Sequence, residues 1–300
     1  MAQWRQWGLA DSTCKSMQNL IFYHDTVMTV VVLVLTVVGF FLLLFLLKNY
    51  TLSGLTSRFI SSNERLEAFW AVAPSVILAY LGFSSLLNLY TMEMTGMEPD
   101  YVVKVTGRQW YWSYSSNVVS TLEEGVDYTI DYDSYMIPEE DLTGEVNYAF
   151  RLNEVDEALY LPADKKIRLL FGADDVMHSF YVPGLGVKVD CIPGRVNSAV
   201  LDSQVGVYYG KCTEICGAHH SHMPIKVEFM VESDFLGVIG SFLLEQVSDH
   251  QASLTDEGAG SEVVGSLENG VNKVEDDFEL AGDSDGVDLF SLVSNDDVND

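Results

Sequence analysis

Basic residues are scarce in this sequence. Its 300 residues include 16 Lys and Arg against 44 Asp and Glu, which gives a formal net charge of −28. Such a charge argues against nucleic acid or an anionic lipid surface as a partner, because both would repel the chain. A basic protein, a metal ion or a solvated acidic tail would suit it. Hydrophobic residues make up 48% of the sequence, too many for a wholly disordered acidic chain.

The charge is unevenly distributed along the chain, which shows no internal repeat. Residues 1–90 carry 5 basic and 4 acidic side chains, residues 91–248 carry 10 and 25, and residues 249–300 carry 1 and 15. We therefore expect a membrane segment within residues 1–100, an acidic folded domain over 101–248 and an acidic tail.

Two long stretches lack charge altogether, at residues 27–47 and 68–90. Each is long enough to cross a hydrocarbon core as a helix. The alternative, two buried helices of a soluble protein, would need other segments to cover them on all sides, which the rest of the chain does not offer. The first stretch is too long for a signal peptide and follows a polar lead that contains acids. The sequence predicts a transmembrane hairpin.

The distribution of positive charge gives the hairpin an orientation. Lys48, Arg58 and Arg65 lie in the connecting loop. The positive-inside rule then puts this loop inside and both ends outside, although Arg5 and Lys15 weaken the bias.

Short β-rich runs at 101–105, 166–171, 176–182 and 225–231, separated by Pro and Gly, predict an all-β sandwich or barrel. Apolar residues at helical spacing over 235–243 predict one closing amphipathic helix. Beyond residue 248 the chain is rich in Gly, Ser, Asn and acids without sustained periodicity, which predicts a disordered acidic tail. An alternative role for this tail is to attract a basic partner.

Cysteine is also scarce, and two of the four cysteines share one segment with histidine and methionine. Cys212, Cys216, His220 and Met223 follow the spacing Cys-x3-Cys-x3-His-x2-Met. A thioether is a poor zinc ligand but a good copper ligand, so this set favours copper. The two cysteines alone would also be compatible with a disulfide or half of a zinc site.

Two thiolates can bridge two copper ions, which leaves one histidine for each ion. His178, in a predicted strand upstream, is the natural second histidine, as in a cupredoxin-like copper domain. Met223 would be axial to one ion, and the backbone carbonyl of Glu214 would serve the other. An electron shared over two metals suits an electron carrier better than a catalyst. Of the remaining candidates, we regard His219 and His222 as surface or core residues, Cys191 as a buried free thiol and Cys14 as inert.

These residues resemble one family, subunit II of mitochondrial cytochrome c oxidase with its binuclear copper A centre. The resemblance covers roughly residues 10–247. It rests on the ligand loop 212–224 and on the segments 175–178, 182–190, 192–195, 109–114 and 133–136.

The resemblance implies roles that the spacing does not. The copper ligands of the family match His178, Cys212, Glu214 through its carbonyl, Cys216, His220 and Met223, and the side chain matching Glu214 also binds magnesium shared with subunit I. The residue matching Trp110 accepts the electron from cytochrome c, whereas the strand pattern alone favours Trp110 and Trp112 as core residues on one face. Asp133 and Asp175 match acids that dock cytochrome c, and Glu67 matches a glutamate at the mouth of a proton pathway into subunit I.

The sequence departs from the family in several places. The stretch 115–132 is longer than the usual linker, and Ser115 replaces an acid used in docking. Cys191 stands where alanine is typical, and His222 stands where an aromatic is typical and could tune the copper potential. No signal peptide is visible, which favours the mitochondrial inner membrane with the copper domain and both termini in the intermembrane space.

Three other functions remain open at this stage. A membrane-anchored copper-delivery protein would need open, exchangeable ligands. A quinol oxidase subunit II would keep the fold without the ligands, and the copper A carrier of nitrous oxide reductase lacks this hairpin. The leading interpretation is a subunit that passes electrons from cytochrome c to subunit I, where oxygen is reduced and protons are pumped.

Overall fold

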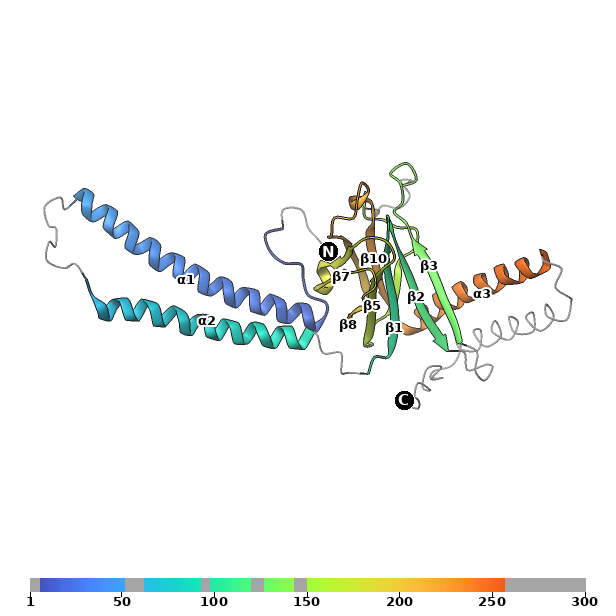
Figure 1. Cartoon of the computed structure of the whole chain (residues 1–300), viewed down its shortest axis with the longest axis horizontal. Helices are drawn as coiled ribbons and strands as arrows, with labels where there is room; N and C mark the ends of the chain where they lie inside the picture. The colour runs from blue at the N-terminus through green and yellow to red at the C-terminus, as the bar shows by residue number, and fades with distance from the viewer. Residues whose placement is uncertain (1–5, 52–61, 93–97, 120–126, 143–149, 257–300) are drawn as a thin grey trace.

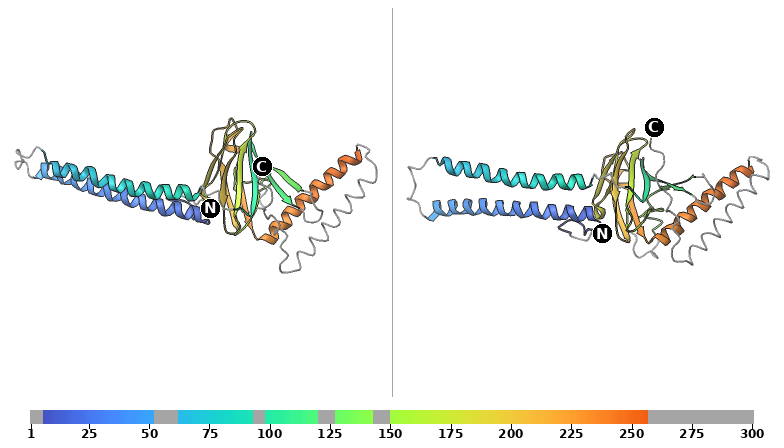
Figure 2. Two further views of the ribbon diagram at one scale, coloured as in Figure 1. Left: turned by 60° about the horizontal axis from the view of Figure 1, so that its bottom comes forward. Right: turned by 90° about the horizontal axis from the view of Figure 1, so that it is seen from below.

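The structure is a computed structural model that describes residues 6–51, 62–92, 98–119, 127–142 and 150–256. Two long helices, α1 (Lys15–Thr51) and α2 (Glu64–Met92), run side by side and project away from a β domain (Figures 1 and 2). Both predicted spans lie within these helices, which confirms the hairpin.

The hairpin exposes its apolar side chains. The apolar windows of α1 and α2 bury nothing inside the structure, and each helix is long and apolar enough to cross a bilayer. Where the helices meet near the domain, the Asn88 side-chain amide donates to the backbone carbonyl of Asn19 at 3.4 Å. Lipid is the environment that can cover such surfaces.

Within the residues that the structure describes, ten strands form a sandwich of two five-stranded sheets, as the short β-rich runs and their turn signals predict. The first sheet has the order β3-β2-β1-β5-β8 and the second β4-β10-β9-β6-β7. The first comprises β1 (Tyr101–Arg108), β2 (Tyr111–Val119), β3 (Asp127–Ser134), β5 (Ile167–Ala173) and β8 (Asn197–Leu201). The second comprises β4 (Leu159–Pro162), β6 (His178–Val182), β7 (Val187–Cys191), β9 (Gly206–Cys212) and β10 (Pro224–Met230).

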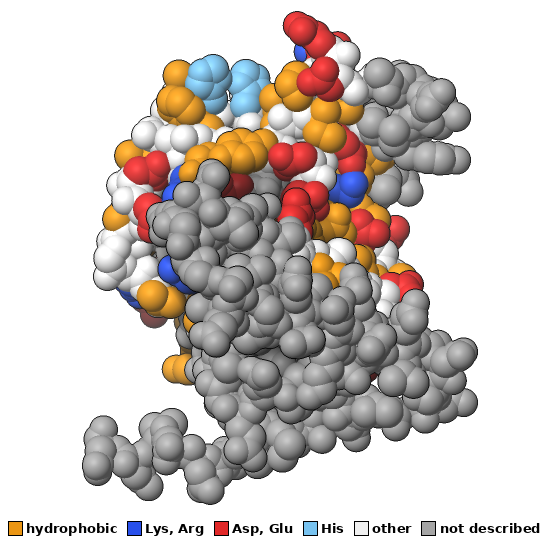
Figure 3. All heavy atoms as spheres, turned by 90° about the vertical axis from the view of Figure 1, so that its right-hand side faces the viewer, with side chains coloured by type: hydrophobic (Ala, Val, Ile, Leu, Met, Phe, Trp, Pro, Cys, Tyr) orange, Lys and Arg blue, Asp and Glu red, His pale blue; other side chains and the backbone are white. Residues whose placement is uncertain are grey.

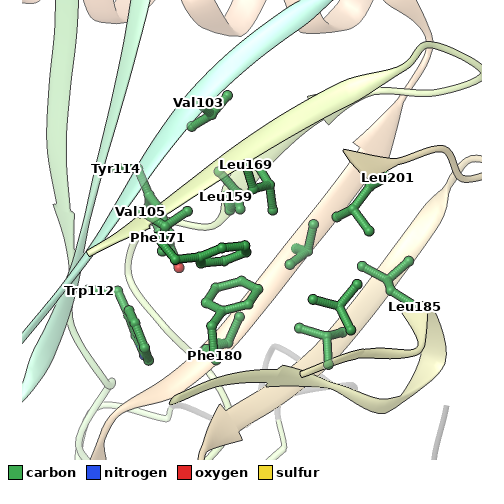
Figure 4. Packing of buried hydrophobic residues seen from close by; sticks show 14 of the residues in the cluster. Val103, Val105, Trp112, Tyr114, Leu159, Leu169, Phe171, Phe180, Leu185 and Leu201 are labelled. Carbon is green, nitrogen blue, oxygen red and sulfur yellow. The ribbon is translucent and has the colours of Figure 1, made fainter. Parts of the chain in front are cut away.

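The core lies between the sheets. In β5, alternate residues from Ile167 to Ala173 are buried, because successive strand side chains point to opposite faces. Phe180 of the second sheet lies 5.3 Å from both Phe171 and Trp112 of the first, measured between ring centroids (Figure 4). This aromatic contact lies next to His178, the first residue of β6.

The stretch that the sequence suggests is a long linker, 115–132, belongs largely to two paired strands. β2 and β3 are antiparallel, with Trp112 opposite Ser134 and Val119 opposite Asp127. The added length therefore extends a hairpin at the edge of the first sheet.

The predicted amphipathic helix is confirmed as α3 (Glu232–Asp256). Phe235 and Ile239 pack on Ile130, and the Phe242 ring stacks on Tyr132 at 4.7 Å. The helix continues to Asp256, beyond the boundary that we expect at residue 248. The remainder of the predicted tail, 257–300, lies outside the described residues.

The chain just before and within the first turn of α1 packs on the β domain. A short 3-10 turn, η1 (Pro183–Leu185), joins β6 to β7 at this end. The Cys14 thiol donates to the carbonyl of Leu185 at 3.1 Å, and Met17 is buried against Gly186. Gly186 has φ +65, and a Cβ there would lie 3.1 Å from Met17. This contact seats the hairpin on the sandwich.

Candidate metal centre

The sandwich brings all the predicted copper ligands to one end. His178 begins β6 and Cys212 ends β9, and these strands are antiparallel neighbours. The loop from β9 to β10 supplies Cys216, His220 and Met223. Residues far apart in the sequence therefore meet, because β6 begins and the adjacent antiparallel strand β9 ends at the same end of the sheet.

The donor atoms converge within ordinary contact distance. The Cys212 and Cys216 sulfurs are 4.0 Å apart, too far for a disulfide. His178 Nδ1 is 3.9 Å from the Cys212 sulfur, and His220 Nδ1 is 3.4 Å from the Cys216 sulfur. The Met223 sulfur lies 3.5 Å from Cys216. The Glu214 carbonyl lies 3.3 Å from the Cys212 sulfur. The donor atoms of His178, Cys212 and Cys216 all lie within 4.8 Å of one another, and each of the other three predicted donors contacts one of the two sulfurs.

The site is buried, and burial shapes its acid–base chemistry. Burial and the neighbouring Cys212 sulfur raise the pKa of Cys216 to about 12. Burial is the largest single influence and tends to raise the pKa of Cys212, but the hydrogen bonds with His178 and with the backbone, together with the charge of His178, outweigh it and leave the pKa below the usual value. The two sulfurs therefore resist carrying two negative charges unless a cation lies between them.

The donor set fits copper. Two thiols, two imidazoles and a thioether are soft or borderline ligands, and the thioether in particular favours copper over zinc. His178 and Met223 are 0% and 1% exposed, so the site is closed to solvent on their side.

Asp175 holds His178 in place. Its carboxylate lies 2.9 Å from His178 Nε2 and accepts hydrogen bonds from the backbone N–H groups of Gln109 and Val176, each at 2.6 Å. These bonds orient the ring so that Nδ1 faces the cysteines. The sequence identifies Asp175 only as a docking acid, and its position three residues before His178 is the signal that could have suggested this support.

Two further residues shape the site: Gly107, which the sequence does not single out, and Trp112, which the strand pattern predicts as a core residue. Gly107 of β1 lies against the His178 ring, where an added Cβ would come within 2.9 Å. Trp112 is fully buried and donates from Nε1 to the Met223 carbonyl at 3.4 Å. Cys191, which the sequence predicts as a buried free thiol, is opposite His178 in the β6–β7 pair and is fully buried, as predicted.

Trp110 lies in the turn between β1 and β2, which separates it from Trp112. It is half-buried, and its Nε1 donates to the Cys216 carbonyl at 3.3 Å. The Gln109 side chain donates to the same carbonyl at 2.9 Å. The expectation from alternation alone, that both tryptophans share one core face, is wrong for Trp110, because the turn redirects its side chain to the ligand loop.

The other predicted residues lie outside this cluster. Asp133 is exposed on β3 and accepts a hydrogen bond from Ser113. Glu67 is exposed in the first turn of α2, which begins after Asn63 at the loop end of the hairpin. The Glu214 residue is half-exposed beside the ligands. His219 and His222 are exposed and contact each other.

Known proteins resemble both parts of the chain. Residues 101–230 match a family described as cytochrome C oxidase subunit II, periplasmic domain, and residues 2–87 match its transmembrane domain. Cytochrome c oxidase subunit 2 of Drosophila simulans is 38% identical over 242 residues, or 80% of this chain and 99% of that one. The Artemia franciscana protein is 39% identical over 237 residues, or 79% and 96% of the two chains. Among solved structures, the periplasmic domain of subunit II of cytochrome oxidase from Bradyrhizobium japonicum is 32% identical, with a TM-score of 0.42 over 50% of this chain and 97% of that one.

Proposed function

Because the chain belongs to the cytochrome c oxidase subunit II family, and is thus a membrane-bound subunit of an oxidoreductase complex, we propose that it is where electrons from cytochrome c enter that complex. The convergence of two cysteines, two histidines and a methionine in one largely buried cluster carries this proposal. These five side chains and the Glu214 carbonyl would hold a binuclear copper A centre. When bound, the copper pair supplies reversible one-electron transfer.

Neighbouring residues hold the proposed ligands in position without a bound metal. Asp175 fixes the tautomer and direction of His178, since it occupies Nε2 and leaves Nδ1 toward the cysteines. Trp112 and the Gly107 backbone close the opposite side. Burial keeps water from the ligands, which is the opposite of the open site that a copper-delivery protein needs.

Trp110 is the residue that we propose accepts the electron. Its indole is hydrogen bonded to the carbonyl of Cys216, one residue of the ligand pair, and so touches both the surface and the site. A flat aromatic at this position offers a haem edge a close contact.

Negative charge would guide the basic cytochrome to this surface. Residues 91–248 carry 25 acids against 10 basic residues. A summed field of this sign raises the association rate of a positively charged partner. Asp133 is exposed and suits this role, whereas the Asp175 carboxylate is also committed to three hydrogen bonds.

The remaining parts of the proposal concern the membrane partner. We place the copper domain and both termini in the intermembrane space, with the hairpin in the mitochondrial inner membrane beside subunit I. Glu67 would lie at the inner end of α2, near a proton pathway in that subunit. The half-exposed Glu214 side chain would help to bind a magnesium ion at the interface with subunit I.

Absorption and electron paramagnetic resonance spectra of the purified oxidase complex test the copper assignment. The wild-type complex should give a mixed-valence two-copper signal, and Cys216→Ser should lose it. Cys14→Ser is the matched control, because Cys14 is also a buried thiol but bonds to Leu185 at the opposite end of the domain. An intact two-copper signal in Cys216→Ser would rule out the ligand set.

A further inference from the structure

Two histidines of the ligand loop take no part in the buried cluster. His219 and His222 are both exposed, and Figure 3 shows histidine side chains gathered at one edge of the domain. Their Nδ1 atoms lie 3.2 Å apart. The two imidazole rings are tilted at 34°, with centroids 5.4 Å apart.

The local backbone explains why these rings meet. η2 (His220–His222) is a 3-10 turn, and the N–H of His222 donates to the carbonyl of His219 at 2.8 Å. Side chains three residues apart eclipse one another in a 3-10 turn. His219 and His222 therefore project together on the outer side, while His220 approaches the Cys216 sulfur.

We propose that His219 and His222 form a second metal site, a two-histidine chelate at the surface that takes a borderline divalent transition metal such as Zn²⁺. Two nitrogens bound to one tetrahedral zinc at about 2.0–2.1 Å would be separated by about 3.3 Å. The observed Nδ1–Nδ1 distance of 3.2 Å matches this separation. Solvent would supply the remaining ligands.

The surroundings favour a preformed site for a cation. The Trp110 ring packs edge-on against the His219 ring at 4.8 Å, which limits the rotation of that imidazole. The acidic balance of residues 91–248 concentrates cations at the domain surface. An N–H···N hydrogen bond between the two rings would give a similar distance in the absence of metal. A metal site and a simple hydrogen-bonded pair are therefore distinguished by whether the two histidines bind zinc.

A Zn²⁺ ion bound by His219 and His222 would place two positive charges beside Trp110. This consequence rests on the proposed function, since a basic cytochrome that docks there would be repelled. The expected effect is a higher KM for reduced cytochrome c at a nearly constant kcat, because docking is weakened and later steps are not.

Equilibrium dialysis of the chelator-washed, copper-loaded oxidase complex against zinc sulfate tests the site, with zinc and copper measured by elemental analysis. We expect the wild-type complex to bind one more zinc per copy of this chain than His219→Gln/His222→Gln. Each single variant should lose the same zinc, because one imidazole does not chelate. The matched control is His24→Gln, which removes another exposed histidine whose Nδ1 lies 3.2 Å from Asp25.

The copper content of each variant shows whether the substitutions have also disturbed the proposed copper site. Equal zinc in the wild type and the double variant, with copper unchanged, overturns the second site and leaves the proposed function intact. A zinc-dependent rise in KM that disappears in the double variant supports the site beside Trp110. A full complement of zinc with no change in KM overturns the consequence for docking.

Discussion

Gly107 offers a direct test of how tightly the β sandwich positions His178, a proposed copper ligand. In Gly107→Ala the new methyl would lie 2.9 Å from Cβ, Cγ and Cδ2 of His178. Ordinary van der Waals contact begins at 3.4 Å, so the ring must retreat by about 0.5 Å. Ring movement is opposed by Asp175 on Nε2 and by Trp112, whose ring centroid lies 6.0 Å from that of His178.

The displacement exceeds what a metal site tolerates. Metal–ligand distances are held within about 0.2 Å, and loss of a group that positions a ligand costs about 10- to 100-fold in metal affinity. We therefore expect copper affinity to fall by about 10- to 100-fold in Gly107→Ala. The free energy of unfolding should fall by about 1–3 kcal/mol, as for other overpacked cores.

Gly172→Ala is the matched control. Gly172 lies on the neighbouring strand β5, opposite Thr106, and a Cβ there has nothing within 4 Å. This variant should keep its copper and gain about 0.4–1 kcal/mol of stability from a less flexible unfolded chain. Copper retained against graded chelator, measured on both purified complexes, gives the comparison. Equal retention would refute the argument that Gly107 sets the position of His178.

Three further changes probe the rest of the domain. Trp112→Phe removes the donor to the Met223 carbonyl and should cost about 1–3 kcal/mol in the free energy of unfolding, measured by denaturant titration. Glu154→Ala leaves the largely buried Lys226 without its ion-pair partner and should lower the free energy of unfolding by about 3–5 kcal/mol in the same titration. The double variant Glu154→Ala/Lys226→Met should recover most of that loss. Asp175→Asn should weaken copper binding by about 10- to 100-fold in the chelator assay. If Asp175→Asn changes only the salt dependence of the KM for cytochrome c, Asp175 acts in docking instead.

Local patterns account for what the sequence predicts well. The two spans follow from the absence of charge, and β5 and β10 follow from short β-rich runs bounded by turn residues. Five of the six proposed copper donors lie within the ligand loop 212–224, so their spacing already constrains their geometry. The upstream candidate, His178, is predicted because a cupredoxin-like site needs a histidine from a strand, and the structure brings it beside Cys212.

Non-local contacts account for what it does not predict. Trp110 and Trp112 alternate in sequence, but the turn before β2 places one beside Cys216 and the other in the core. Gly107 meets His178 only because β1 and β6 belong to facing sheets. Nothing in the one-dimensional pattern specifies which strands face one another at that point.

The contact between α1 and the sandwich makes the β6–β7 hairpin a rigid connection from the membrane helix to the candidate metal centre. Its closed tip, Pro183–Leu185, rests against Cys14 and the first turn of α1, while its open end pairs His178 with Cys191. A change in the tilt of α1, for example in a thicker bilayer, would be transmitted along this hairpin to His178, a proposed copper ligand. Since the rate of electron transfer falls steeply with distance, the thickness of the surrounding lipid becomes one of the variables that set the rate at which electrons leave this domain.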